Sequence, residues 1–348
     1  MAMVLHPGIG APPAPRVSVC IANYDGEALL PDCIASVLAQ DTDAAIEILV
    51  HDDASRDRSV ELLRTRWPQV HVIASEENVG FCVGNNRMVT AAAGEYVLLL
   101  NNDAALQPDA IRQLLAEAER NGGPAILTLP QYDWDTGALV DRGCLLDPFF
   151  NPVPNLDAAR DDVAYVIGAC LWCPRTAWHV LGGFPEWMES IGEDLYLCGL
   201  ARLRGMPVRA LCTSGYRHRQ GATFGGNRAG EAGLRTSKKR RRLSERNKTR
   251  ALEILTPGDG MWLLLSTHLL LLALEGFVLS LIKRDRDLWQ DVYWPALSAP
   301  VLEDTMLSAL RRDVQATRTI TAMQWFATTR WQLRKLMLLF QHGTPDIR

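Results

Sequence analysis

The stretch Glu95-Tyr96-Val97-Leu98-Leu99-Leu100-Asn101-Asn102-Asp103 decides the fold class. Its apolar run is too short for a typical helix, and it lies between Gly94 and Pro108, so it predicts a buried strand. Both faces of a central strand in a parallel sheet are covered, which explains the unbroken apolar run. The run ends in two amides and a carboxylate, at the strand end where open α/β sheets bind their ligands.

The carboxylate of Asp103 has two interpretations from this stretch alone. A lone acid at a strand end is a hard oxygen ligand for a divalent cation, which commonly carries a phosphate. Alternatively, Asn102 and Asp103 are residue types that cap the start of a following helix. The remainder of the chain favours the first interpretation.

Strands and helices alternate before this stretch. Residues 16–22, 46–50 and 70–73 predict strands, and the segments between them predict amphipathic helices, so we expect a parallel sheet with right-handed crossovers. Polar residues follow three of the strands. They are Asn23, Tyr24, Asp52, Asp53, Asn101 and Asp103. This repetition at one sheet edge favours a binding site there over unrelated turns.

Composition excludes several protein classes. The chain has 348 residues, 48% of them hydrophobic and 22% charged, which is ordinary for a globular protein of one or two domains. A net charge of −4 gives no indication of a nucleic-acid partner. The cysteines are scattered and no secretory signal is recognisable, so we expect reduced thiols and a cytoplasmic protein. Residues 1–15, rich in Pro, Gly and Ala, are predicted to be disordered.

Glycine-rich phosphate loops are missing from the strand ends. Neither GxGxxG after the first strand nor GxxxxGK[ST] occurs, which disfavours dinucleotide dehydrogenases and P-loop enzymes. A nucleotide diphosphate bound to this sheet therefore needs another source of positive charge, and a metal held by Asp103 would supply it.

Four segments resemble, in order and spacing, the successive motifs of family 2 glycosyltransferases. They are residues 17–24, 52–57, 78–81 and 99–103. The resemblance implies a GT-A fold, an α/β structure whose mostly parallel sheet is flanked by helices, and inverting transfer of a sugar from a nucleotide-diphosphate-sugar. It places Asn101-Asn102-Asp103 at the family's DxD position, with Asp103 binding Mg²⁺ or Mn²⁺. Asn101 replaces the first acid, as in members that resemble rhamnosyltransferases.

The resemblance also implies a set of donor-binding residues. We expect Asp52 or Asp53 to bind the base or ribose, and Tyr24 to stack near the base. The complete nucleotide-sugar-binding set is Ala22, Asn23, Tyr24, Asp52, Asp53, Asn78, Gly80, Asn86, Asn101, Asn102 and Gly168.

The second half extends the resemblance. Residues 165–171 predict another strand, and residues 181–186 resemble the family's GGFDE turn. Glu193-Asp194 resembles the ED motif, whose Asp is the general base that takes the proton of the acceptor hydroxyl. The alternative is an ordinary acidic first turn favoured by the helix dipole, which would also keep Asp194 ionised. Glu193 competes for the role, and Tyr196 stands where the family often has a further Asp.

His218 matches a histidine near the end of many GT-A domains. A neutral imidazole there could ligate the metal or contact the diphosphate, whereas an exposed or capping histidine is the alternative. Arg217 and Arg219 flank it and suit phosphate.

The C-terminal third combines basic and apolar segments. Residues 224–242 resemble the family's flexible loop, and residues 244–247 resemble its RN element, which opens the C-terminal helices. Residues 261–282 have the length of a bilayer span, but Glu275 would be costly in hydrocarbon, so a helix in the membrane interface or one packed on the catalytic domain fits better. A second apolar helix over 325–340, with basic residues, suits an anionic membrane surface; internal packing or a homodimer interface is the alternative.

These observations lead to a domain plan and a function. We expect a disordered N-terminus over 1–15, a GT-A catalytic domain over 16–225, and a flexible basic loop with a helical extension over 226–348. The acceptor would be a saccharide, a lipid-linked saccharide or a protein, in cell-surface polysaccharide or glycoconjugate synthesis, on the inner face of the cell membrane.

Two other functions remain open. A metal-dependent nucleotidyltransferase would need a first loop rich in Gly and Lys or Arg, where this chain has Asn23-Tyr24-Asp25-Gly26. A catalytically degenerate membrane scaffold would account for Asn101 and Tyr196 in place of acids.

Overall fold

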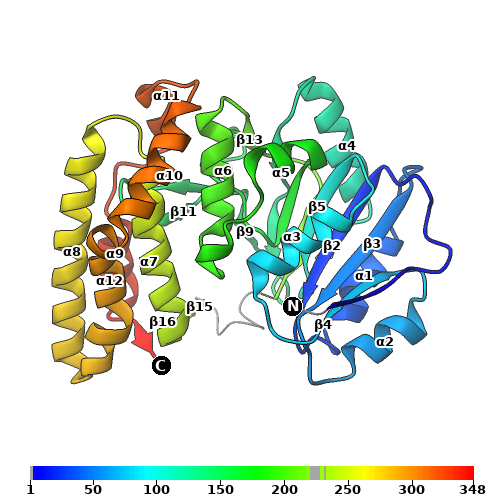
Figure 1. Cartoon of the computed structure of the whole chain (residues 1–348), viewed down its shortest axis with the longest axis horizontal. Helices are drawn as coiled ribbons and strands as arrows, with labels where there is room; N and C mark the ends of the chain where they lie inside the picture. The colour runs from blue at the N-terminus through cyan, green and yellow to red at the C-terminus, as the bar shows by residue number, and fades with distance from the viewer. Residues whose placement is uncertain (1–2, 220–227, 231–232) are drawn as a thin grey trace.

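The sheet at the centre of the fold has eight strands. The computed structural model describes residues 3–219, 228–230 and 233–348. The strand order is β1-β4-β3-β2-β5-β12-β7-β13 (Figure 1). The strands are β1 (Met3–His6), β2 (Val17–Asn23), β3 (Ile46–Asp52), β4 (His71–Ser75), β5 (Tyr96–Asn101), β7 (Ile126–Thr128), β12 (Cys170–Pro174) and β13 (Val208–Ala210). β4, β3, β2 and β5 are parallel, as predicted, and β12 runs antiparallel to β5.

Helices cover both faces of this sheet (Figure 1). One group is α1 (Leu30–Leu38), α2 (Ser59–Arg66) and α4 (Ala110–Asn121); the other is α3 (Phe81–Ala91), α5 (Arg175–Leu181) and α6 (Glu193–Leu203). Successive residues of a strand point to opposite faces. Leu98 and Leu100 of β5 accordingly lie in the hydrophobic core on the side of α1, α2 and α4. Val97 and Leu99 lie in the core on the side of α3, α5 and α6. The buried central strand predicted from residues 95–103 is therefore confirmed.

A smaller, four-stranded sheet brings together two segments that are far apart in the sequence. Its order is β6-β14-β8-β9, from β6 (Ala104–Leu106), β14 (Tyr216–His218), β8 (Gln131–Asp133) and β9 (Leu139–Asp141). β6 starts directly after Asp103, and its antiparallel register with β14 pairs Ala104 with His218. This pairing places His218 beside Asp103, although the two are far apart in sequence.

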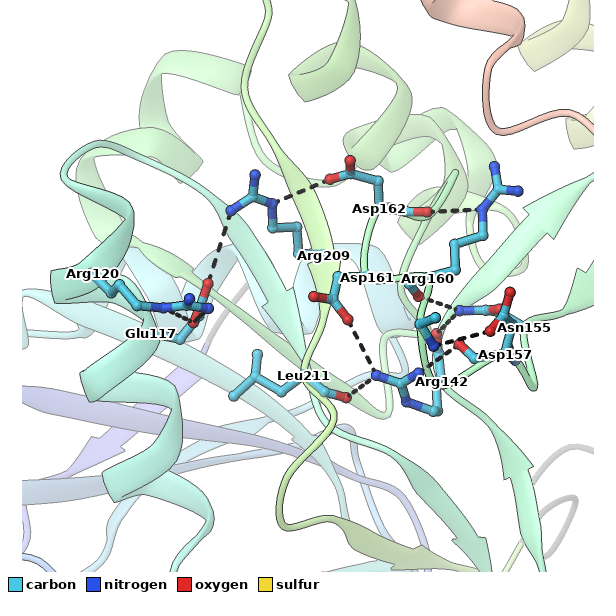
Figure 2. Close-up of polar contacts among 11 residues, drawn as sticks. Glu117, Arg120, Arg142, Asn155, Asp157, Arg160, Asp161, Asp162, Arg209 and Leu211 are labelled. Atoms are coloured by element: carbon cyan, nitrogen blue, oxygen red, sulfur yellow. Dashed lines mark hydrogen bonds and ion pairs between the residues drawn. The ribbon is translucent and has the colours of Figure 1, made fainter.

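The edge of the main sheet is closed by a polar network (Figure 2). The buried guanidinium of Arg142 donates to the carbonyl oxygens of Asp157 (2.6 Å) and Leu211 (3.1 Å), and lies 3.3 Å from Asp161. Arg209 of β13 pairs with Asp162 at 3.2 Å. These contacts attach the loop after the hairpin β10 (Cys144–Leu146) and β11 (Pro152–Pro154) to the edge strand.

The C-terminal helices pack directly on helices of the central sheet. They are α7 (Lys238–Leu255), α8 (Gly260–Lys283), η2 (Leu288–Tyr293), α9 (Trp294–Leu302), α10 (Asp304–Ala316), α11 (Ala322–Phe326) and α12 (Arg334–His342). Leu252 and Leu255 of α7 and Leu307 of α10 are buried in the same core as Leu99 and Leu197. The segment after residue 225 therefore shares a core with the preceding part. β15 (Arg228–Gly230), β16 (Gly233–Thr236) and β17 (Asp346–Ile347) form a separate small sheet.

Four expectations need correction. Disorder over residues 1–15 is wrong for Met3–His6, because β1 extends the sheet by pairing antiparallel with β4. The strand predicted over 165–171 begins only at Cys170, because residues 167–169 turn to meet α6. The basic residues 238–242, expected in a flexible loop, and the RN element both lie inside α7, which begins at Lys238. The helix predicted over 325–340 is divided into α11 and α12. The rest of the predicted flexible loop includes residues 220–227 and 231–232, which lie outside the described residues.

Candidate active site

The ends of β2, β3 and β5 are joined by side-chain hydrogen bonds. Asn23 Nδ2 donates to Asp52 Oδ2 at 2.9 Å, and Asn102 Nδ2 donates to Asn23 Oδ1 at 2.9 Å. Asp52 also accepts from the backbone N–H of Ser55 (3.0 Å) and from its hydroxyl (2.6 Å). The predicted residues therefore converge at the carboxyl edge of the sheet, where most of their polar atoms stabilise the loops. Tyr24 is half-buried beside them.

Asp53 organises the next loop. Its carboxylate accepts the backbone N–H groups of Val79 (2.7 Å) and Gly80 (2.9 Å). Gly80 has φ of +88°, a left-handed conformation that favours glycine, and it leads directly into α3. Asn78 is exposed at the tip of this loop. These hydrogen bonds join two of the segments that resemble family motifs, residues 52–57 and residues 78–81.

Asp103 and His218 face each other at the end of β5. His218 Nε2 lies 3.0 Å from Asp103 Oδ1, and both residues are buried. His218 Nδ1 lies 3.0 Å from Gln131 Oε1, which also accepts from the hydroxyl of Tyr216 at 2.8 Å. In this orientation of the Gln131 amide, which leaves its Nε2 buried without a partner, Oε1 accepts the proton of His218 Nδ1 and His218 Nε2 presents a lone pair. Two lone-pair atoms at this distance require a proton or a cation between them.

This pair fits a divalent metal. Asp103 Oδ1 is buried and accepts no hydrogen bond from the described residues. Adjacent ligands in an octahedral shell with metal–ligand distances of about 2.0–2.1 Å lie about 3 Å apart, which matches the observed separation. The described residues contain no cluster of three or more His, Cys, Asp or Glu that could hold a metal. Within the part of the chain that the structure describes, Asp103 and His218 are therefore the two residues that would hold it.

Asp194 is fixed at the start of α6. Its Oδ2 accepts the backbone N–H of Gly168 at 3.1 Å, and its Oδ1 accepts the N–H of Leu195 at 2.7 Å. The next residue, Ala169, accepts the backbone N–H of Asn101 at 3.1 Å. The Gly168-Ala169 backbone therefore links the carboxylate of Asp194 to the end of β5, and so to the Asp103–His218 pair.

Burial raises the pKa of both acids at this helix start. Burial raises the pKa of Asp194, and the hydrogen bond from Gly168 and the charge of Arg240 oppose this shift. Burial, together with the charge of Asp194, raises the pKa of Glu193 to about 8. We expected the helix dipole to keep Asp194 ionised; burial opposes this by raising the pKa of its carboxyl group.

Two residues of α7 belong to this site but received no role from the sequence. Arg240, in the first turn of α7, is the cation near both acids, and burial lowers the pKa of its own guanidinium. Asn247 Nδ2 donates to the carbonyl oxygens of Met188 (2.8 Å), Ser190 (3.0 Å) and Ile191 (2.9 Å). Asn247 belongs to the segment that resembles the family's RN element. Its hydrogen-bond partners could not be predicted from that resemblance, because they lie 56 to 59 residues away in sequence.

Asn86 lies elsewhere than expected. Its Nδ2 donates to the Phe184 carbonyl, and its Oδ1 accepts the Phe184 N–H, both at 2.9 Å. Its amide therefore holds the turn 181–186 instead of pointing to the ends of β2 and β5. Asn101 remains close to the metal pair, with Nδ2 3.4 Å from His218 Nε2. Ala22 and Gly168 contribute backbone at the sheet edge.

Comparison with known proteins identifies the fold family. The model of glycosyl transferase family 2 matches residues 18–177. The chain carries a family 2 glycosyltransferase domain. The matched range includes β3, β5 and all but the first residue of β2, and it ends within α5. The GT-A fold predicted from the motifs is confirmed.

Two of the curated relatives are much longer proteins than this chain. It is 28% identical over 217 residues to the O-antigen biosynthesis protein RfbC of Myxococcus xanthus, covering 58% of this chain and 17% of that protein. It is 27% identical over 188 residues to the chondroitin synthase of Pasteurella multocida, covering 53% and 18%. The chain therefore spans less than a fifth of the length of these relatives.

Solved structures share the fold at low identity. Staphylococcus aureus TarS residues 1–349 in complex with UDP superimposes with a TM-score of 0.51 at 18% identity, covering 73% of this chain and 70% of that one. GalNAc-T7 with UDP, GalNAc and Mn²⁺ gives a TM-score of 0.57 at 13% identity, covering 84% and 58%.

Proposed function

We propose that this family 2 chain transfers a sugar from a nucleotide-diphosphate-sugar to a hydroxyl of a growing surface glycan, with inversion at the anomeric carbon. The observation that carries the proposal is the link between Asp194 and the Asp103–His218 pair through Gly168-Ala169. A base and a metal-binding pair held by one backbone segment suit a single displacement. Relatives named for O-antigen and chondroitin synthesis support a glycan acceptor.

The proposed mechanism uses these residues as follows. Asp194 accepts the proton of the acceptor hydroxyl as its oxygen bonds to the anomeric carbon, and the bond from that carbon to the diphosphate breaks on the opposite side. Asp103 and His218 would hold Mg²⁺ or Mn²⁺, which neutralises charge on the leaving diphosphate when bound. GalNAc-T7, a fold neighbour, has Mn²⁺ in its structure. Asp52 and Asp53 shape the loops that receive the base and ribose.

Product analysis tests this proposal. The purified chain is incubated with Mn²⁺ and a panel of nucleotide-sugars, with and without a glycan acceptor, and the released nucleotide is identified. We expect a nucleoside diphosphate. A nucleotidyltransferase would instead release pyrophosphate from a nucleoside triphosphate and a sugar phosphate. A degenerate scaffold would release neither.

We also propose that the chain associates with the inner face of the cell membrane through α8. Among the described residues, α8 is the helix long and apolar enough to cross a membrane, and 28% of its most apolar window is buried. Its Glu275 is directed inward: it accepts from Lys335 Nζ (2.7 Å) and from the Tyr293 hydroxyl (3.1 Å), and pairs with Arg241. This cluster attaches α8 to the neighbouring helices, which favours a helix lying in the interface over one that spans the bilayer.

The outer face of α8 supports the same proposal. Its exposed large side chains are Trp262, Leu263, Leu270, Leu271, Leu274, Phe277, Val278, Leu281 and Ile282. Lys283, Arg284 and Arg286 follow directly and are exposed, which suits anionic headgroups. Flotation with anionic liposomes at low and high salt tests it, and a soluble dimer by light scattering would assign this face to a second copy instead.

A further inference from the structure

Arg240 lies near the two acids at the start of α6 but forms an ion pair with neither. It is seven residues before Asn247 in α7, and residues seven apart lie on the same face of a helix. Asn247 donates to carbonyls of the segment before α6, so this face of α7 is directed at Glu193 and Asp194. Figure 1 shows α7 beside α6. The guanidinium of Arg240 forms no hydrogen bond or ion pair with the residues that the structure describes.

A second arginine approaches the same region from α12. The backbone N–H of Arg334 donates to Asp147 Oδ2 at 3.1 Å, which fixes the start of α12 beside the end of β10. In β10, the N–H of Cys144 donates to the carbonyl of Tyr165 at 2.9 Å. Burial raises the pKa of the Cys144 thiol; the charge of Asp194 adds to this shift, and the charge of Arg334 opposes it. The other arginine lies near Tyr165, so both cations border the residues that surround Asp194.

Two buried polar atoms in this region have no partner. They are Glu193 Oε2, on a side chain of a residue that is 6% exposed, and Arg334 Nε; neither forms a hydrogen bond within the described part of the chain. Buried polar groups are nearly always hydrogen-bonded, and a desolvated charge without a counter-charge is more costly still. Two guanidinium groups without ion pairs and one unpartnered carboxyl oxygen therefore point to a ligand with an anionic group and a hydroxyl.

The geometry of the reaction decides which substrate carries the anion. A guanidinium fork matches the oxygens of carboxylates and phosphates. In the proposed displacement, the base and the leaving diphosphate lie on opposite sides of the anomeric carbon. Arg240 lies on the side of Asp194, so the anion that it suits belongs to the acceptor. Because two cations are present there, an anion can bind beside Asp194 without net repulsion.

We propose that Arg240 and Arg334 bind an acidic group of the acceptor, while Glu193 Oε2 hydrogen-bonds to one of its hydroxyls. Two sources supply this oxyanion chemistry. A uronic acid unit of a glycan carries a carboxylate, and a lipid-linked saccharide carries a diphosphate beside its first sugar. The assignment of the ligand as acceptor rests on the proposed function, but its binding does not require turnover.

Binding measured with the donor site filled tests the proposal. Saturating UDP and Mn²⁺ are present throughout, so that an added anion does not report on the Asp103–His218 pair. Saturation-transfer NMR compares methyl β-D-glucuronide with methyl β-D-glucoside, which has a hydroxymethyl group in place of the carboxylate. Geranyl diphosphate is compared with geraniol for the lipid source. We expect at least one acidic probe to bind about tenfold more tightly than its neutral partner, the effect of a hydrogen bond to a charged group.

Arginine variants locate the site. Arg240→Gln and Arg334→Gln should each lower the affinity for the acidic probe about tenfold and leave that for the neutral probe unchanged. Arg240→Lys keeps the charge and should retain part of the preference. Arg64→Gln removes an exposed arginine of α2 that also has no ion pair, and should leave both affinities unchanged. No preference for either acidic probe, or wild-type affinity in both glutamine variants, would overturn the proposal.

Binding and transfer give separable results. Release of nucleoside diphosphate with an acceptor, combined with no preference for acidic probes, would overturn the anion site and leave the proposed function intact. Arginine-dependent binding of an acidic probe, without release from any nucleotide-sugar, would support the anion site and contradict the proposed function.

Discussion

His218 Nε2 and Asp103 Oδ1 lie 3.0 Å apart, and the orientation of the imidazole is set from behind by Gln131. The Gln131 carbonyl keeps the proton on Nδ1, so the atom that faces Asp103 is the one with a lone pair. Metal affinity at this site should therefore depend on a residue that would not touch the metal.

Replacing Gln131 tests this dependence. We expect Gln131→Leu to weaken Mn²⁺ binding about 10–100-fold, the usual effect of removing a group that orients a metal-ligating histidine. The measurement is calorimetric titration of Mn²⁺ in the presence of a saturating nucleoside diphosphate. Gln113→Leu, in α4 and outside the site, is the matched control. Unchanged Mn²⁺ affinity in Gln131→Leu would remove His218 from the metal shell.

Asn247 holds the segment before Glu193 and Asp194 through three carbonyls. We expect Asn247→Ala to lower the free energy of unfolding by about 1–3 kcal/mol, because buried carbonyl groups lose their donor. Turnover should fall more than donor affinity, because Asp194 is displaced while Asp52 and Asp103 stay in place. Urea denaturation and steady-state kinetics give both values. Arg246→Ala removes the partly exposed pair with Glu189 and a hydrogen bond to Asn247 Oδ1 at 3.2 Å. It should lower stability less than Asn247→Ala, because it leaves no buried carbonyl without its donor.

Glu193 gives the fold a pH dependence. Its pKa is about 8 in the folded protein, above the ordinary value of 4.5. Between these values the folded state binds more protons than the unfolded state, so this residue makes stability fall as pH rises from about 4.5 to 8. Glu193→Gln cannot ionise, so its advantage in Tm over wild type should grow across this range. A constant difference between the two proteins from pH 5 to 8 would contradict the raised pKa.

The sequence predicted the sheet well because its strands are unbroken apolar runs between turn residues. Leu98 and Leu100 face one layer of helices and Val97 and Leu99 the other, a pattern that single-residue hydrophobicity already indicates. β1 was missed because its short segment lies among Pro, Gly and Ala, and it is a strand only through its pairing with β4. Tertiary context decided this element.

The site was predicted in its residue types but not in its connections. Asp103 and His218 were both selected as metal ligands, and the β6–β14 register brings them together. Asn86 was assigned to the donor because it follows a family motif, but its amide is used by the backbone of Phe184. Arg240 lies in a run of similar basic residues. Nothing in that run distinguishes the residue that lies near Glu193 and Asp194 from its neighbours.

The role of Asp194 as general base is the central claim, and one comparison tests it most directly. Transfer rate and donor affinity are measured for Asp194→Asn and Glu193→Gln, with wild type as reference, at a pH where wild type is fully active. Asp194→Asn keeps the size and the acceptor oxygen that bonds to Gly168 but removes the basicity. We expect kcat to fall by about 10²–10⁴, the usual contribution of a positioned base, with donor affinity near that of wild type. Near-normal turnover in Asp194→Asn, or a comparable loss in Glu193→Gln alone, would contradict the account.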